Sequence, residues 1–268
     1  MSLFSAARSD ARILVVQPSE KAPCGNIGKG LAKRNATVTL VRAYENEPLP
    51  ENTDVYDGLV VLGGPQHAFD DEAGPYFGQL MSLMRLFDSE DKPVAGICLG
   101  GQLLARAYGG LPHRLEALEF GFVAHQLTDQ GKRDPIIGEL PLPPLMEFHE
   151  DSFMLPAEAT LLVEGDWCRN QIFKVGNVSY GFQPHIEVDI EIAGLWLEAL
   201  KGGEIDNYRK YRGSFHESFF EELAADLRRL VEASGKYCEG FLENWLTLTG
   251  KKRIFRMPNR YTEYTNGE

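Results

Sequence analysis

The feature that most constrains this fold is the pentapeptide Gly96-Ile97-Cys98-Leu99-Gly100, which lies between an apolar run and a helix-like stretch. The apolar run is residues 93–95, and the helix-like stretch is residues 102–107. A strand that turns sharply into a helix around Gly-x-nucleophile-x-Gly forms a nucleophile elbow, because the glycines tolerate the crowded backbone. The dipole and free N–H groups of the helix start favour the thiolate of Cys98. The pentapeptide therefore predicts a cysteine nucleophile, with an inert buried cysteine as the alternative.

Four short runs rich in β-branched residues occur in the first hundred residues. They are residues 13–16, 36–41, 59–62 and 94–97. Nearly continuous apolar runs are typical of parallel strands that helices cover on both faces. Between them, residues 27–34 and 76–88 carry apolar side chains at mainly helical spacing. This alternation of strand and helix predicts an α/β fold with a doubly wound, mostly parallel sheet.

The pattern of apolar and turn-forming residues changes after about residue 120. Turn-separated strands are expected at residues 122–127, 160–163 and 171–175, which predicts an antiparallel extension of the sheet. Beyond residue 190 the pattern is helical, and Ser214-Phe215-His216-Glu217 has the capping-box pattern of a helix start. We therefore expect a catalytic domain in residues 1–190, a helical extension packed on it in residues 191–250, and a polar tail in residues 251–268.

Composition excludes several classes of partner. The formal net charge is −12 and the only tight basic run is Lys251-Lys252-Arg253, so a nucleic-acid partner is not expected. The four cysteines lie too far apart for the close pairs of a zinc site and are too few for a disulfide scaffold, so we expect no metal and a reducing cytoplasm. No apolar stretch approaches the roughly 18 residues of a membrane span, so no membrane partner is expected.

The glycine-rich segment at residues 25–30 invites comparison with a phosphate-binding loop. Its spacing matches neither the GxxxxGK[ST] sequence of that loop nor the G-x-G-x-x-G of a dinucleotide site. We therefore expect a flexible loop there and no cofactor.

A nucleophilic thiol needs a base, and the base needs an orienting group. His185 and Glu187 form a His-x-Glu pair after a strand-like segment, and residues at i and i+2 of an extended chain project to the same side. Glycines 63 and 64 end a buried strand, so their N–H groups can point toward a developing oxyanion. Gln102 lies one helical turn beyond Cys98. Each of these features also has an ordinary alternative, as a surface polar pair, a simple turn or a solvent-facing glutamine.

Taken together, the motifs resemble those of class I glutamine amidotransferases. The matching segments are residues 96–104, 62–65, 119–122, 148–153 and 181–188, in the order and spacing of that family. The resemblance covers roughly residues 10–190 and is strongest to stand-alone relatives of the amidotransferase domain of GMP synthase. It implies the α/β fold expected from the strand pattern.

The resemblance also implies a mechanism and a set of site residues. Cys98 attacks the side-chain amide of glutamine, His185 shuttles the proton, and Glu187 orients His185. Ammonia leaves first, and water then releases glutamate from the γ-glutamyl thioester. The implied oxyanion hole consists of the backbone N–H groups of Gly64 and Leu99, and the implied substrate-binding residues are Gly63, Gln102, His149 and Glu150.

Two departures from the family pattern affect this assignment. Gln183-Pro184-His185-Ile186-Glu187 stands where the family usually has Gln-Phe-His-Pro-Glu, so the loop around the histidine differs. His149-Glu150-Asp151 replaces His-Gly-Asp, which places a carboxylate where glycine is usual. This second change implies a narrower pocket or one tuned to another γ-glutamyl compound.

Three functions remain open from the sequence. The first is a glutaminase that delivers ammonia to a synthase on a separate subunit. The second is a stand-alone hydrolase of γ-glutamyl peptides or γ-glutamyl amines. The third is a non-catalytic binding or regulatory protein, against which the intact Cys98, His185 and Glu187 argue. For the first two, the expected ligand is a small molecule with a γ-glutamyl group.

Overall fold

The computed structural model describes residues 10–201 and 218–250, and an eight-stranded sheet forms its centre. The strand order is β2-β1-β3-β4-β10-β9-β8-β6. The strands are β1 Arg12–Gln17, β2 Thr37–Arg42, β3 Gly58–Val61, β4 Val94–Ile97, β6 Gln126–Leu127, β8 Thr160–Glu164, β9 Asn170–Val175 and β10 Ser179–Phe182. Strand β10 is parallel to β4 and antiparallel to β9, so it joins a parallel half to an antiparallel half. This confirms the predicted fold class.

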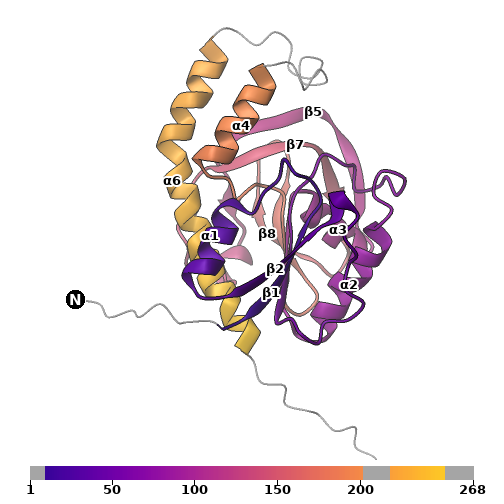
Figure 1. Cartoon of the computed structure of the whole chain (residues 1–268). Coiled ribbons are helices and arrows are strands. Elements are labelled where there is room, and N and C mark those ends of the chain that lie inside the picture. The colour runs from indigo at the N-terminus through magenta and orange to yellow at the C-terminus, as the bar shows by residue number, and fades with distance from the viewer. Residues whose placement is uncertain (1–9, 202–217, 251–268) are drawn as a thin grey trace, which may run out of the picture.

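Helices cover both faces of this sheet (Figure 1). The helices are α1 Gly25–Lys33, α2 Phe77–Ser89, α3 Leu99–Ala107, α4 Ile190–Lys201 and α6 Ser218–Leu246, and the 3₁₀ turns are η1 Ala43–Glu45, η2 Gly131–Arg133 and η3 Thr247–Gly250. In β1, Ile13 and Val15 pack in the core beneath α1 and α6, whereas Leu14 and Val16 pack beneath α2 and α3. Because successive strand residues point to opposite faces, a strand covered on both sides is apolar at every position.

A second sheet of two strands was not apparent from the sequence. Strands β5 (Leu111–Val123) and β7 (Leu145–Met154) pair antiparallel, with an irregular register between Arg114 and Glu119. Its apolar side chains pack against α4 and α6, and Figure 1 shows the two strands beside these helices. The predicted single strand at 122–127 is wrong, because the chain leaves β5 after Val123 and turns the His125 side chain inward to Glu147, 2.8 Å away, before β6 begins.

Residues 25–30 form the first turns of α1, so the predicted flexible loop is also wrong. Gly25 has φ +46°, and a Cβ there would collide with the carbonyl oxygen of Glu187. The glycine is required because the start of α1 approaches the backbone of a distant segment.

The long helix α6 packs against α1, and its last turns belong to the core of the sheet. Phe241 contacts Phe182 of β10 edge-on, with ring centroids 4.8 Å apart, and Trp245 is fully buried. None of the described helices has both the length and the apolar character needed to cross a bilayer. The predicted capping box at 214–217 and polar tail at 251–268 lie outside the described residues, and the domain boundary at 190 stays a prediction.

Trp245→Ala is expected to lower the free energy of unfolding by about 3–5 kcal/mol, because it removes a large side chain from the core beneath the sheet. Chemical denaturation of both proteins measures the change. The matched control is Trp167→Ala, since Trp167 is 50% exposed and its loss leaves no buried void. Equal effects of the two substitutions would contradict the packing of α6 as an integral part of the core.

Candidate active site

Cys98 occupies a strained elbow between β4 and α3. Its backbone has φ 48° and ψ −109°, a conformation that non-glycine residues rarely adopt. The Cys98 N–H donates to the carbonyl of Phe182 at 2.7 Å, which ties the elbow to the end of β10. A Cβ at Gly96 would collide with the backbone of Gly100, and one at Gly100 would collide with that of Val61. Both glycines of the pentapeptide are therefore needed for the turn that presents the sulfur.

His185 and Glu187 follow directly after β10. Because β10 lies beside β4 in parallel, both strands end at the same edge of the sheet. His185 Nδ1 lies 2.6 Å from Glu187 Oε1, and both side chains are buried. The His185 N–H donates to the carbonyl of Met146, and its ring packs edge-on against Trp196 of α4 at 4.8 Å. Contacts with Glu187, Met146 and Trp196 thus hold the backbone and the ring of His185 in place.

The His185 ring and Cys98 meet at Gly63. A Cβ on Gly63 would lie 3.0 Å from His185 Cε1 and 3.5 Å from Cys98 Cβ, so only a glycine fits comfortably between them. Burial lowers the pKa of His185, but the Glu187 carboxylate and the Cys98 sulfur outweigh it and hold this pKa well above its ordinary value. An imidazolium next to a sulfur favours the thiolate and is placed to act as a general acid.

The two predicted oxyanion-hole residues are neighbours. A Cβ on Gly64 would lie 3.0 Å from Leu99 Cδ2. Leu99 is the first residue of α3, where an N–H group has no acceptor within its own helix. The structure therefore places Gly64 and Leu99 together beside Cys98, while their role as hydrogen-bond donors stays a prediction.

Gln102 is almost completely buried, which excludes the alternative of a solvent-facing glutamine. Its Nε2 donates to the carbonyl of Asp151 at 3.2 Å and to Gln183 Oε1 at 3.3 Å. Gln183 Nε2 in turn lies 3.8 Å from the sulfur of Cys98. Gln183 was not predicted as a site residue, although its position two residues before His185 was a usable signal.

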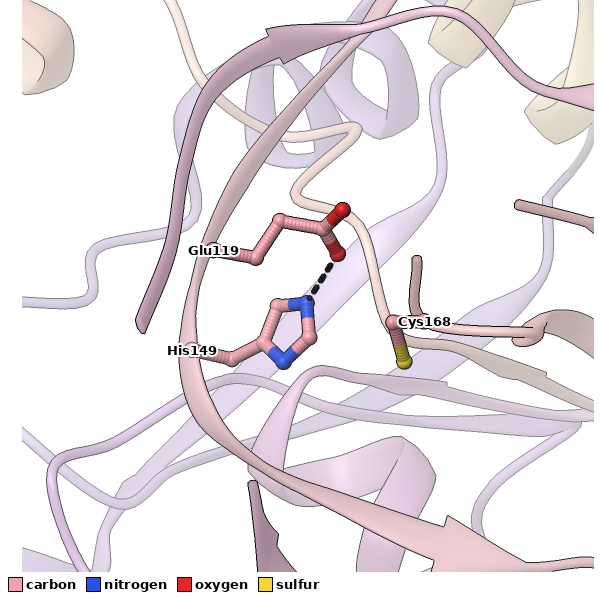
Figure 2. Close-up of side chains that lie close together, drawn as sticks. All are labelled: Glu119, His149 and Cys168. Atoms are coloured by element: carbon pink, nitrogen blue, oxygen red, sulfur yellow. Dashed lines mark hydrogen bonds and ion pairs between the residues drawn. The ribbon is translucent and has the colours of Figure 1, made fainter. Parts of the chain in front are cut away.

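The predicted substrate-binding residues His149 and Glu150 face different surroundings. Both ring nitrogens of His149 bond within the protein, Nδ1 to the carbonyl of Asp151 at 2.8 Å and Nε2 to Glu119 at 2.9 Å (Figure 2). Burial lowers the pKa of His149, but the carboxylates of Glu119 and Glu147 outweigh it and hold this pKa well above its ordinary value. Substrate binding by the His149 side chain stays a prediction.

Glu150 belongs to a partly exposed group of charges, here called the charged rim, that comprises His67, Arg114, Glu150 and Asp151. Arg114 pairs with Glu150 at 2.9 Å, and His67 Nδ1 lies 2.7 Å from Asp151 Oδ2. The rim adjoins the nucleophile side because the backbone carbonyl of Asp151 accepts the hydrogen bond from Gln102. His67 and Arg114 were missed from the sequence because they lie outside the family motifs, although His67 closely follows Gly64.

The start of α1 also supports the histidine loop. Asn26 donates its backbone N–H to the carbonyl of Glu187 at 2.7 Å and its side-chain amide to the carbonyl of Val188 at 2.8 Å. These bonds fix the segment that carries the carboxylate facing His185. Sequence reasoning missed Asn26, because nothing in the glycine-rich segment indicates which distant backbone it meets.

Glu187→Gln is expected to shift the alkaline limb of the kcat/KM profile to lower pH and to reduce kcat/KM at neutral pH by about 10²-fold. Glu187 is a cause of the raised pKa of His185, so with it the imidazolium persists above the ordinary value of about 6.5. An amide keeps the hydrogen bond but not the charge. Glu191→Gln removes an exposed carboxylate nearby as a control. An alkaline limb that stays in place would contradict the pairing.

The sequence also matches known proteins that belong to one family. The family model for class I glutamine amidotransferases matches residues 22–193. The glutamine amidotransferase-like protein YfeJ of Salmonella typhimurium is 37% identical over 162 residues, which are 59% of this chain and 68% of YfeJ. Gamma-glutamyl peptidase 3 of Arabidopsis thaliana is 30% identical over 160 residues, 57% of this chain and 64% of the peptidase. The match thus spans slightly less than two thirds of the peptidase.

The solved structures agree with the sequence matches. The crystal structure of a glutamine amidotransferase from Methylobacillus flagellatus aligns with a TM-score of 0.75 at 26% identity, over 89% of this chain and 95% of that chain. The family model spans more than half of the sequence, and its matched region contains the elbow and the histidine loop. The chain therefore belongs to the class I glutamine amidotransferase family.

Proposed function

We propose that this protein hydrolyses the γ-glutamyl amide bond of a small molecule through a cysteine thioester. Glutamine is the first candidate for the substrate. The observation that supports this most directly is the strained elbow of Cys98 beside the buried pair of His185 and Glu187. A strained backbone is retained where the surrounding structure enforces it, as at sites that present a nucleophile.

The proposed steps use these groups in turn. The Cys98 thiolate attacks the amide carbon, and the N–H groups of Gly64 and Leu99 stabilise the negative oxygen of the tetrahedral intermediate. His185 donates its proton to the leaving nitrogen, so ammonia departs and a γ-glutamyl thioester remains. Neutral His185 then takes a proton from water, which attacks the thioester and releases glutamate. The carbon–sulfur bond breaks and releases the Cys98 thiolate, so the thiolate–imidazolium pair is restored with the proton that His185 took from water.

The charged rim favours a second candidate, the hydrolysis of γ-glutamyl peptides. Ammonia, the leaving group from glutamine, needs no recognition beyond the reacting nitrogen. A peptide leaving group carries a carboxylate, for which the Arg114 guanidinium at the rim is a suitable partner. The name of the peptidase relative agrees with this candidate. In the glutamine candidate, the ammonia passes to a synthase on a separate subunit.

Ammonia and glutamate release from purified protein tests the proposal, with glutamine, γ-glutamyl peptides and γ-glutamyl amines as substrates. High turnover of a γ-glutamyl peptide without a second protein supports the peptidase candidate. Glutamine turnover that increases when a synthase is added supports the glutaminase candidate. Glu150→Gly restores the usual family residue and is expected to change the kcat/KM ratio between peptide and glutamine by about tenfold. The absence of release from every substrate, with Cys98 unreactive toward electrophiles, would overturn the proposal.

A further inference from the structure

Next to the candidate active site, three buried side chains place metal-ligating atoms close together. They are Glu119 of β5, His149 of β7 and Cys168 of the β8–β9 loop, and one donor atom of each lies within 4.8 Å of the others. Figure 2 shows that the Glu119 carboxylate and the Cys168 sulfur both lie toward the outer edge of the His149 ring. Each of the three residues is at most 4% exposed.

The orientation of the His149 ring suits a ligand. Its Nδ1 lies 2.8 Å from the carbonyl of Asp151, which can only accept, so this nitrogen carries a hydrogen. Metal-bound histidines typically donate their second nitrogen in this way, which leaves the lone pair on the other nitrogen for the metal. In the neutral ring, the lone pair is therefore on Nε2, the atom that faces the other members of the cluster.

Nε2 of His149 is surrounded by atoms that donate electron pairs. Glu119 Oε2 lies 2.9 Å away and Glu147 Oε2 lies 3.1 Å away. Glu147 Oε2 is buried and accepts no hydrogen bond, although His149 Nε2 lies 3.1 Å from it. Two carboxylates, a sulfur and a nitrogen lone pair that converge in a buried place favour a positive charge between them, which a bound metal ion supplies in place of a proton on Nε2.

Neighbouring groups already orient these atoms. Gln171 Nε2 lies 3.3 Å from Glu119 Oε2, and His125 Nε2 lies 2.8 Å from the second oxygen of Glu147. Outer hydrogen bonds of this kind hold the ligands of metal sites in place.

We infer that Glu119, His149 and Cys168 bind a zinc ion. The combination of thiolate, imidazole and carboxylate suits zinc better than the hard cations calcium and magnesium, which take oxygen ligands. All three ligands are buried, which suits a structural site more than a catalytic one that must admit a substrate. It fastens the β8–β9 loop to the β5–β7 sheet, and through the carbonyl of Asp151 it adjoins Gln102.

Metal analysis of the protein purified from zinc-supplemented cells tests this inference. The wild type is expected to carry about one zinc ion per chain. Cys168→Ala should lose most of the metal, whereas Cys238→Ala, which removes an equally buried thiol outside the cluster, should keep it. A wild type without stoichiometric metal, or equal metal in both variants, would overturn the inference.

Cobalt substitution gives a readout that does not depend on the stability of the variants. After chelation, the wild type should bind Co²⁺ with the visible bands of a tetrahedral site and a sulfur-to-metal charge-transfer band. A chelator should also lower the melting temperature of the wild type and of Cys238→Ala. If Cys168→Ala does not fold, the wild-type cobalt spectrum alone tests the metal site. A wild type without these bands has a proton on His149 in place of the metal, which would overturn the inference.

Discussion

Cys98→Ser is expected to lower kcat by on the order of 10⁴-fold or more. A hydroxyl is a far weaker nucleophile than a thiolate at neutral pH, even beside the same base. Serine is close in size to cysteine, so the elbow and its bond to Phe182 should persist and the melting temperature should change little. Glutamate release and thermal unfolding, measured on the same preparation, separate lost chemistry from lost structure. A serine variant with near-normal turnover would contradict the nucleophile.

Labelling with a glutamine-like electrophile identifies the reactive thiol directly. Burial raises the pKa of Cys24 and Cys238, so these side chains remain thiols at neutral pH, and Cys168 is buried in the proposed metal cluster. The strained elbow instead places Cys98 at a helix start, beside the imidazole of His185. Mass spectrometry should therefore find a single adduct, on Cys98. An adduct on any of the other three cysteines instead would remove the basis of the mechanism.

His185→Ala is expected to reduce kcat by about 10⁴-fold, a larger loss than in Glu187→Gln. Without the imidazole, the thiol has no base to activate it and the leaving nitrogen has no proton donor. His113→Ala is the matched control, because His113 lies exposed on β5 and its ring bonds only to a nearby carbonyl in the described contacts. Steady-state kinetics at a single pH measure kcat for both variants. Comparable losses of kcat in the two would contradict a specific role of His185.

Several features could be predicted from the sequence because they depend on neighbouring residues. Residues 96–100 predicted the elbow, since only glycine at the flanking positions permits the turn at Cys98. The apolar runs predicted β1, β3 and β4, because a strand covered on both faces is apolar throughout. The spacing of His185 and Glu187 likewise predicted their contact, which an extended chain produces locally.

Only the tertiary structure decided which distant segments meet. The parallel pairing of β4 with β10 brings the Cys98 elbow to the same sheet edge as the loop of His185, and no local pattern specifies that pairing. The β5–β7 sheet was missed because its strands mix polar and apolar residues and depend on α4 and α6 for cover. The cluster of Glu119, His149 and Cys168 has the same origin, since a search for closely spaced cysteines cannot detect ligands that a strand pairing and a loop bring together. The sequence by itself determined the local geometry of the Cys98 elbow, and the packing of distant strands decided what surrounds it.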